Sequence, residues 1–174
     1  MGAAVGVLLC AAAAPARASS LRYCDAPAPM SAAQQDKLLR VAGILKDELE
    51  RVGKSQGTRA ALIARSGLNL RWFGMRYSHA GLSLAGSSDA PWSVRQLYFS
   101  CDDQAPRLFD QGLPAFLLGT ENPDLGYISL VLLPADATAP LEPLALDNRT
   151  ALSLLGATYS ANALRNAGQW TIGA

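Results

Sequence analysis

The amino-acid sequence predicts an α+β fold with a central antiparallel sheet and flanking helices. Strand patterns bounded by turn residues cluster in the middle of the chain, between residues 60 and 133. Helical spacing of apolar residues occurs toward both ends, over residues 31–53 and 144–155. Separate blocks of helices and strands are typical of α+β proteins, whereas a regular alternation of the two is typical of parallel sheets.

The first helix is predicted to begin after Ser31, because Ser31 and Gln34 form a capping-box pattern. Gly53 is predicted to end it, since glycine often follows the last residue of a helix. The apolar residues that recur at helical spacing are Leu38, Val41, Ala42, Leu45, Leu49 and Val52. The charged residues on the opposite face indicate a solvated surface.

The predicted strands cover residues 60–64, 77–84, 93–101 and 126–133. Turn signals rich in Gly, Pro, Ser and Asp lie at residues 86–91 and 110–114. The second helix, over residues 144–155, is predicted to end near Gly156. We expect one α+β domain over residues 31–174, preceded by an extended segment over residues 19–30.

The first 18 residues have the pattern of a secretory signal peptide. An apolar run from Ala3 to Ala14 is followed by Ala16-Arg17-Ala18, which is an A-x-A cleavage site. The run is shorter than the roughly 20 apolar residues of a transmembrane helix. We therefore expect cleavage near Ala18 and a location in the periplasm or outside the cell.

Cleavage at this site would remove Cys10 and leave Cys24 and Cys101. In an oxidising compartment we expect these two cysteines to form a disulfide, and the alternative is two separate thiols. One histidine and a cysteine pair cannot build a His/Cys zinc site, and no glycine motif for phosphate or dinucleotide binding is present. The sequence therefore predicts neither a metal nor a cofactor.

The composition excludes further classes of protein. The chain is 50% hydrophobic and 17% charged, which is the profile of a globular protein and not of a disordered one. Its net charge is +1, and it has no dense run of Lys and Arg. The chain-wide charge therefore indicates neither a nucleic-acid partner nor a polybasic patch for an anionic membrane.

His79 is the only histidine, and so the only side chain whose unperturbed pKa lies near neutrality. Because side chains alternate along a strand, His79, Gly81 and Ser83 share one face, with open space expected beside the imidazole at Gly81. The opposite, apolar face is predicted to be core and consists of Ala80, Leu82 and Leu84.

The following strand carries Gln96 and Tyr98 on one face. If that face coincides with the face of His79, either side chain could form a hydrogen bond with the imidazole and orient it, as a third catalytic group does. His79, Gln96 and Tyr98 are therefore the candidate catalytic residues. The alternative is a half-buried histidine that bonds a neighbouring hydroxyl or carbonyl and has no chemical role.

Six segments are spread along the chain between residues 24 and 163: CD (24–25), ALIARSG (61–67), RYSHAG (76–81), PWSVRQLY (91–98), RLFDQGL (107–113) and GATYSANA (156–163). This combination resembles a secreted bacterial family, domain of unknown function 2145. The stretch YSHAGL (77–82) is also similar to the histidine strand of circularly permuted NlpC-type papain-like proteins. The resemblance implies a papain-like fold in which Gln96 or Tyr98 orients His79.

In the papain-like proteins a cysteine at the N-terminus of a late helix is the nucleophile, since a helix N-terminus and a nearby imidazolium lower the pKa of a thiol. Here Ala167 stands where the resemblance leads us to expect that cysteine. The segment from Leu164 onward is expected to be either truncated or divergent. The nucleophile that the resemblance implies is therefore absent.

Three functions remain open. The first is a non-catalytic module whose groove around His79, Trp92 and Tyr98, with Ser83 on the strand face of His79, holds a peptide or acyl ligand. The second is a degraded gene product whose last helix is incomplete. The third is a cysteine-type amide hydrolase or acyltransferase that acts on cell-wall peptides, with His79 as general base. Because Ala167 cannot be a nucleophile, the sequence favours the two silent interpretations over the enzyme.

Overall fold

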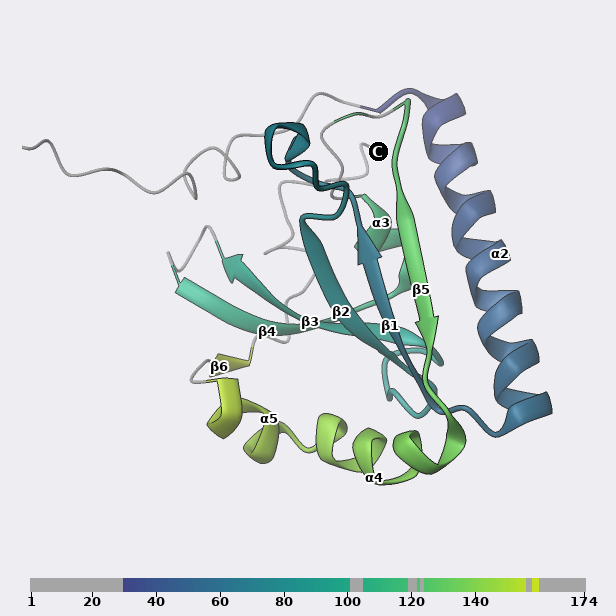
Figure 1. Cartoon of the computed structure of the whole chain (residues 1–174), viewed down its shortest axis with the longest axis vertical. Helices are drawn as coiled ribbons and strands as arrows, with labels where there is room; N and C mark the ends of the chain where they lie inside the picture. The colour runs from purple at the N-terminus through teal and green to yellow at the C-terminus, as the bar shows by residue number, and fades with distance from the viewer. Residues whose placement is uncertain (1–29, 101–104, 119–121, 123, 156–157, 160–174) are drawn as a thin grey trace, which may run out of the picture.

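The computed structural model describes residues 30–100, 105–118, 122, 124–155 and 158–159. Helices and a twisted sheet make up this part of the chain (Figure 1). In chain order the elements are α2 (Ala32–Gln56), β1 (Ala60–Arg65), the 3-10 turn η1 (Arg71–Phe73), β2 (His79–Leu84), β3 (Ser93–Ser100), β4 (Ala105–Gln111), α3 (Leu113–Leu117), β5 (Ile128–Leu132), α4 (Ala135–Leu146), α5 (Asn148–Leu155) and β6 (Thr158–Tyr159).

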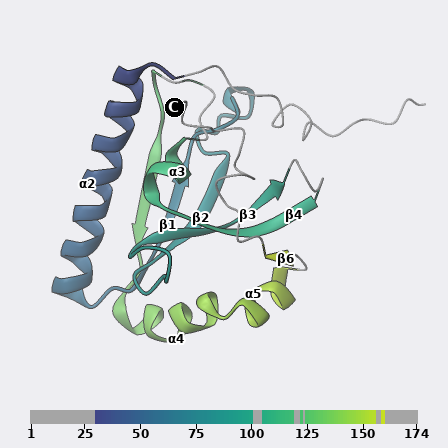
Figure 2. The same cartoon turned by 180° about the vertical axis from the view of Figure 1, so that it is seen from behind.

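The sheet has the strand order β5-β1-β2-β3-β4-β6. The first five of these strands pair antiparallel, and β6 adds to β4 in parallel. Helix α2 lies alongside β5, and α4 and α5 cross one end of the sheet, as both views show (Figures 1 and 2). The predicted α+β class is therefore confirmed.

The start of α2 follows the sequence prediction and its end does not. The capping box is confirmed, because Ser31 Oγ accepts from the Gln34 amide at 3.3 Å and Gln34 Oε1 accepts from the Ser31 amide at 2.8 Å. The prediction that Gly53 ends the helix is wrong. The helix continues to the left-handed Gly57, with φ of 71°, where glycine carries no steric penalty. At Gly53 a Cβ atom would lie 2.9 Å from the Trp92 indole, so this glycine makes room for Trp92.

The core lies between α2, α3 and one face of the sheet. Its buried members are Ala42, Leu49, Ala61, Ile63, Trp92, Val94, Leu113, Phe116 and Leu117. The antiparallel register sets Ser83 opposite Ala61 and Gly81 opposite Ile63, so the His79 face of β2 is the face turned to this core.

Two expectations about β2 are therefore wrong. Of the face predicted to be core, Ala80 is exposed and Leu82 only half-buried, although Leu84 is fully buried. The space at Gly81 is also not open, because a Cβ atom there would lie 2.6 Å from Val94 Cγ1. The helices α2 and α3 cover the face that carries His79, and this packing could not be read from the alternation of residues alone.

The structure also contains elements that the sequence did not predict. Strand β4 ends and helix α3 begins within the turn predicted over residues 110–114, and neither element was predicted, nor was α4, which contains Pro140 and Pro143 in its interior. Prolines in a helix interior remove backbone donors, which makes such a helix hard to recognise. The helix predicted over residues 144–155 is two helices, separated at Asp147, whose Oδ2 accepts hydrogen bonds from the amide and hydroxyl of Thr150.

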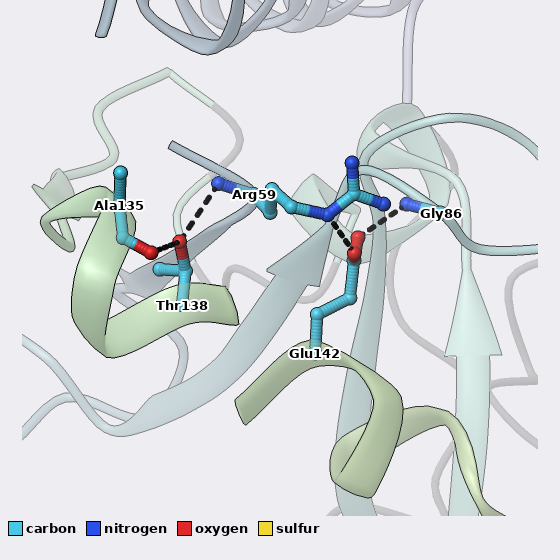
Figure 3. A network of polar contacts seen from close by, with 5 residues as sticks. All are labelled: Arg59, Gly86, Ala135, Thr138 and Glu142. Carbon is cyan, nitrogen blue, oxygen red and sulfur yellow. Dashed lines mark hydrogen bonds and ion pairs between the residues drawn. The ribbon is translucent and has the colours of Figure 1, made fainter. Parts of the chain in front are cut away.

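Partly buried polar contacts fix α4 to the sheet (Figure 3). The Glu142 carboxylate is buried and accepts hydrogen bonds from Arg59 Nε and, at 2.6 Å, from the Gly86 amide. The Thr138 hydroxyl accepts from the Arg59 amide at 3.2 Å and donates to the carbonyl of Ala135 at 3.1 Å. These contacts tie α4 both to the entry of β1 and to the turn between β2 and β3.

An ion pair in which both side chains are buried lies on the sheet face turned away from α2. Arg95 on β3 binds both carboxylate oxygens of Asp110 on β4, at 2.8 and 2.5 Å. Arg95 Nη1 also donates to the Ala145 carbonyl in the last turn of α4, at 2.5 Å. Removing one partner of a buried pair usually costs about 3–5 kcal/mol, because the other charge stays buried. This pair therefore holds the end of α4 in place.

Several predictions concern residues outside the described part of the chain. These are the signal peptide, the segment of residues 19–29, the Cys24–Cys101 disulfide and the alanine at position 167. Among the described residues, no helix is both long and apolar enough to cross a membrane.

A matched pair of glycine substitutions tests the packing of the His79 face. Gly43 lies exposed in the interior of α2, and an added Cβ atom there would meet nothing within 4 Å, so Gly43→Ala should stabilise the protein by about 1 kcal/mol through helix propensity. Gly81→Ala should destabilise it by about 1–3 kcal/mol, because Val94 and the Arg95 carbonyl leave no room. Urea unfolding measures both, and an equal effect of the two changes would contradict the packing.

Candidate functional site

The candidate site forms around His79, the first residue of β2. The register places Arg65, the last residue of β1, directly opposite His79. The imidazole contacts two aromatic rings. The ring centroid of Tyr98 lies 4.9 Å away, edge-on at 89°, and that of Phe116 lies 5.8 Å away at a tilt of 38°. Strands β1, β2 and β3 and the short helix α3 therefore converge on one half-buried imidazole.

A chain of side-chain hydrogen bonds holds the imidazole. His79 Nε2 contacts Gln96 Oε1, and Gln96 Nε2 donates to Gln111 Oε1. Both glutamines are buried. Because the Gln96 amide nitrogen donates to Gln111, its oxygen faces His79 and accepts a hydrogen bond from the Nε2–H of the imidazole. In the neutral ring this leaves the lone pair on Nδ1 as the site that can accept a hydrogen bond.

The surroundings of His79 keep it neutral. Burial and then the positive charge of Arg65 lower the pKa of His79 from its usual 6.5 to about 4, and the hydrogen bond to Gln96 opposes this only in part. At pH 7 the imidazole therefore carries no charge. A general base is most effective when its pKa lies near the working pH, so His79 in this setting is a weak base and a good neutral hydrogen-bond acceptor.

Arg65 supplies the positive charge at the site. Its side chain is only 6% exposed, its Cζ lies 5.3 Å from the ring centroid of Phe116, and its Nη1 donates to the Ser66 carbonyl at 3.2 Å. The face of an aromatic ring attracts a guanidinium, which stabilises the charge where water is excluded. Phe116 therefore packs against both His79 and Arg65 and sets the distance between them.

Two cavities open beside Arg65. The first, of about 220 Å³, is lined by Arg65, Gly67, Ser78, His79, Leu97, Tyr98 and Phe99. The second, of about 310 Å³, lies between α2 and the segment that precedes β5, and it includes Arg65, Leu38, Val41, Leu117, Tyr127 and Ile128 among its walls. Pockets for whole small molecules usually measure about 300–1,000 Å³, so the His79 cavity suits one group of a larger ligand.

The structure brings His79, Gln96 and Tyr98 together, and it places the other two site candidates elsewhere. Trp92 is buried in the core with φ of 66°, and Ser83 is fully buried and donates to the Trp92 carbonyl at 2.7 Å. Neither residue lines the cavity beside His79. Ser83 does share the strand face of His79, but that face turns inward toward α2, so its far end is core and not groove.

Three residues of the site were not singled out from the sequence. Arg65 and Gln111 end strands β1 and β4, and Phe116 lies in a helix of only five residues. Each acquires its role from its neighbours: Arg65 by lying opposite His79, Gln111 by bonding Gln96, and Phe116 by packing on the imidazole. A polar residue that ends an apolar strand, as Arg65 does, was the one available signal.

The described residues contain no group of three or more His, Cys, Asp or Glu side chains that could hold a metal ion.

A family model described as "Uncharacterized protein conserved in bacteria (DUF2145)" matches residues 53–171. This match covers more than half of the chain. The protein belongs to the DUF2145 family. No curated protein and no solved structure matches the chain. The DUF2145 description names no activity, so function has to be inferred from the geometry around His79.

The lowered pKa of His79 should appear in the pH dependence of stability. The unfolded chain takes up this proton near pH 6.5 and the folded chain only near pH 4, so the unfolded state binds more protons between these values. Lowering the pH from 7 to 4 should therefore remove about 3 kcal/mol of stability through His79. Urea unfolding of the wild type and of His79→Gln, compared at each pH, isolates this contribution.

The two proteins share every other titrating group, so the carboxylates cancel in the comparison. A stability difference between them that stays constant from pH 7 to pH 4 would contradict the lowered pKa. Because His79 is the only histidine, its imidazole resonance also gives the folded-state pKa directly by nuclear magnetic resonance.

Proposed function

We propose that this DUF2145 protein is a secreted, papain-like binding module that holds part of a peptide or acyl ligand beside His79 without cleaving it. One observation carries the proposal: a neutral imidazole, fixed through Nε2 by a buried amide, lines a cavity of about 220 Å³. Such an imidazole offers a fixed acceptor to an amide N–H or a hydroxyl of a ligand. Its weak basicity favours recognition over proton abstraction.

The walls of the cavity support a ligand that is partly polar and partly apolar. Leu97, Tyr98 and Phe99 supply apolar and aromatic surface, while His79, Arg65 and Ser78 supply polar atoms. The Ser78 hydroxyl already accepts from the Leu68 amide at 2.9 Å, so its position is fixed before any ligand arrives. A cavity with fixed walls loses less entropy when it binds than a mobile one does.

A cysteine-type amide hydrolase or acyltransferase, with His79 as general base, is the second candidate. The contact between His79 Nε2 and Gln96 favours it, because a third polar group that orients the imidazole is typical of catalytic histidines. Two observations weigh against it: the low pKa of His79 and the alanine at position 167, where the family resemblance leads us to expect the thiol.

Ligand binding should raise the melting temperature and shift the His79 imidazole resonance together. The probes are muramyl dipeptide, a cell-wall stem tetrapeptide and short N-acyl amino acids. At about one hundred times the Kd, a ligand should raise the melting temperature by about 5–10 °C. His79→Gln and Leu97→Ala should weaken binding, whereas Leu39→Ala, the same truncation at an exposed site on α2, should not.

Two results would separate the candidates. If no probe moves either signal at millimolar concentration, the binding proposal is contradicted. If a probe is converted to products by the wild type, but not by His79→Gln, the hydrolase replaces the binding module.

Secretion is tested separately, by the first residue of the mature protein. We expect the chain recovered from the periplasm of a bacterial cell that makes it to begin at Ser19, because the A-x-A site ends at Ala18. N-terminal sequencing measures this, and Ala18→Asp, which places a charge in the site, should leave the precursor uncleaved. A cytoplasmic protein that keeps residues 1–18 would overturn secretion.

A further inference from the structure

The β1–β2 loop (residues 66–78) exposes an unusual amount of apolar surface. Trp72 is 96% exposed, Phe73 is 77% exposed and Met75 is 52% exposed. The 3-10 turn η1 that carries the two aromatic side chains lies at the end of the sheet opposite α4 and α5 (Figures 1 and 2). Contiguous large apolar side chains on a soluble protein usually mark an interaction site.

The backbone of this loop is well supported by hydrogen bonds. The Phe73 amide donates to the Leu70 carbonyl at 2.9 Å, and the Met75 amide donates to the same carbonyl at 3.3 Å. Gly74 adopts a left-handed conformation with φ of 67°, and the Leu68 amide donates to the Ser78 hydroxyl at 2.9 Å. The loop therefore holds its aromatic side chains in the solvent by a defined turn.

The charged residues of the loop itself are all positive, although the chain as a whole is nearly neutral. Between residues 57 and 88 the sequence has four arginines and no acidic residue: Arg59, Arg65, Arg71 and Arg76. Arg59 binds Glu142 and Arg65 is buried, but Arg71 and Arg76 are exposed on either side of the two aromatics. Arg76 also lies over the ring of Tyr127, with its Cζ 5.0 Å from the centroid.

We infer that the β1–β2 loop docks the protein on an anionic phospholipid surface, with Trp72 and Phe73 at the headgroup level. Trp72 is amphipathic through its indole N–H and favours this depth of a bilayer, and Phe73 adds apolar surface. Each arginine near an anionic surface adds to the attraction. A second copy of the chain fits less well, because two such loops would bring four arginines together. None of the four exposed residues Arg71, Trp72, Phe73 and Arg76 lines the His79 cavity, so this inference does not depend on the proposed ligand.

Docking through this loop would also place the His79 cavity near the lipid. Gly67 and Ser78, which lie in the loop, are wall residues of that cavity. The membrane surface would thus be the place where the cavity meets its ligand.

Vesicle sedimentation tests the inference with the full chain and the same N-terminus in every variant. The wild type should bind vesicles of phosphatidylglycerol and phosphatidylethanolamine, and bind phosphatidylcholine vesicles at least about tenfold more weakly. Trp72→Ala with Phe73→Ala should reduce binding to the anionic vesicles by about tenfold or more. Arg71→Gln with Arg76→Gln should reduce it by about thirtyfold, and salt at about 0.5 M should have a similar effect.

Matched substitutions on α2 serve as controls. Leu39→Ala with Ile44→Ala removes two apolar side chains that are 55% and 67% exposed, and Arg40→Gln with Lys54→Gln removes two exposed positive charges. Neither control should change vesicle binding. All four double variants alter exposed side chains, and unchanged melting temperatures will show that each remains folded.

Four results would overturn the inference. The first is no binding to anionic vesicles. The second is binding that the loop variants and the α2 controls reduce equally. The third is a wild-type dimer in sedimentation velocity that Trp72→Ala with Phe73→Ala converts to a monomer, which would assign the loop to self-association. The fourth is binding to a soluble acidic protein, without vesicles, that the loop variants reduce and the α2 controls do not. This result would assign the loop to a protein partner and not to lipid.

Discussion

The packing of α2 and α3 over the His79 face of the sheet is the constraint on which the rest of the structure depends. Phe116 of α3 connects the core to the site, because its ring packs against both His79 and Arg65. The two helices make the His79 face of β2 the core face. On this face Val94 of β3 occupies the space beside Gly81, and Trp92 packs against Gly53 of α2. The packing also leaves part of the opposite face in solvent, where Leu62 and Val131 are exposed.

The same packing sets the chemistry of the site. A histidine near the surface would keep a pKa close to 6.5 and would be partly charged at neutral pH. Under the cover of α3 and beside Arg65, the neutral form is favoured. The buried amides of Gln96 and Gln111 then decide which ring nitrogen carries the proton. Burial, charge and hydrogen bonding thus give one defined imidazole, suited to accepting a hydrogen bond.

The two faces of the sheet stabilise their buried arginines in different ways. On the face turned away from α2, Arg95 and Asp110 form a bidentate buried pair that also binds the end of α4. On the covered face, the guanidinium of Arg65 lies over an aromatic ring next to two cavities. The first arrangement fixes a helix that contains two prolines. The second leaves cavity space around a positive charge, which is the property expected of a binding site and not of a structural pair.

Some parts of this protein follow from the sequence alone. The capping box of α2, the α+β class, the four predicted strands in outline and the contact of His79 with a residue of the next strand depend on local pattern and on alternation, so they could be predicted. The membership of the DUF2145 family also follows from sequence, through motifs spread over most of the chain.

Only the tertiary structure decides which face of β2 is buried, and the physical reason is that alternation defines two faces without naming the one a helix will cover. The apolar face of β2 looked like core, yet α2 and α3 cover the face with His79 because Ala61, Ile63 and Val94 on the neighbouring strands lie there. For the same reason Arg65 belongs to the site through strand register and Phe116 through packing, whereas Trp92 lies in the core and not at the site. Local sequence specifies strands and caps, but long-range packing specifies the site.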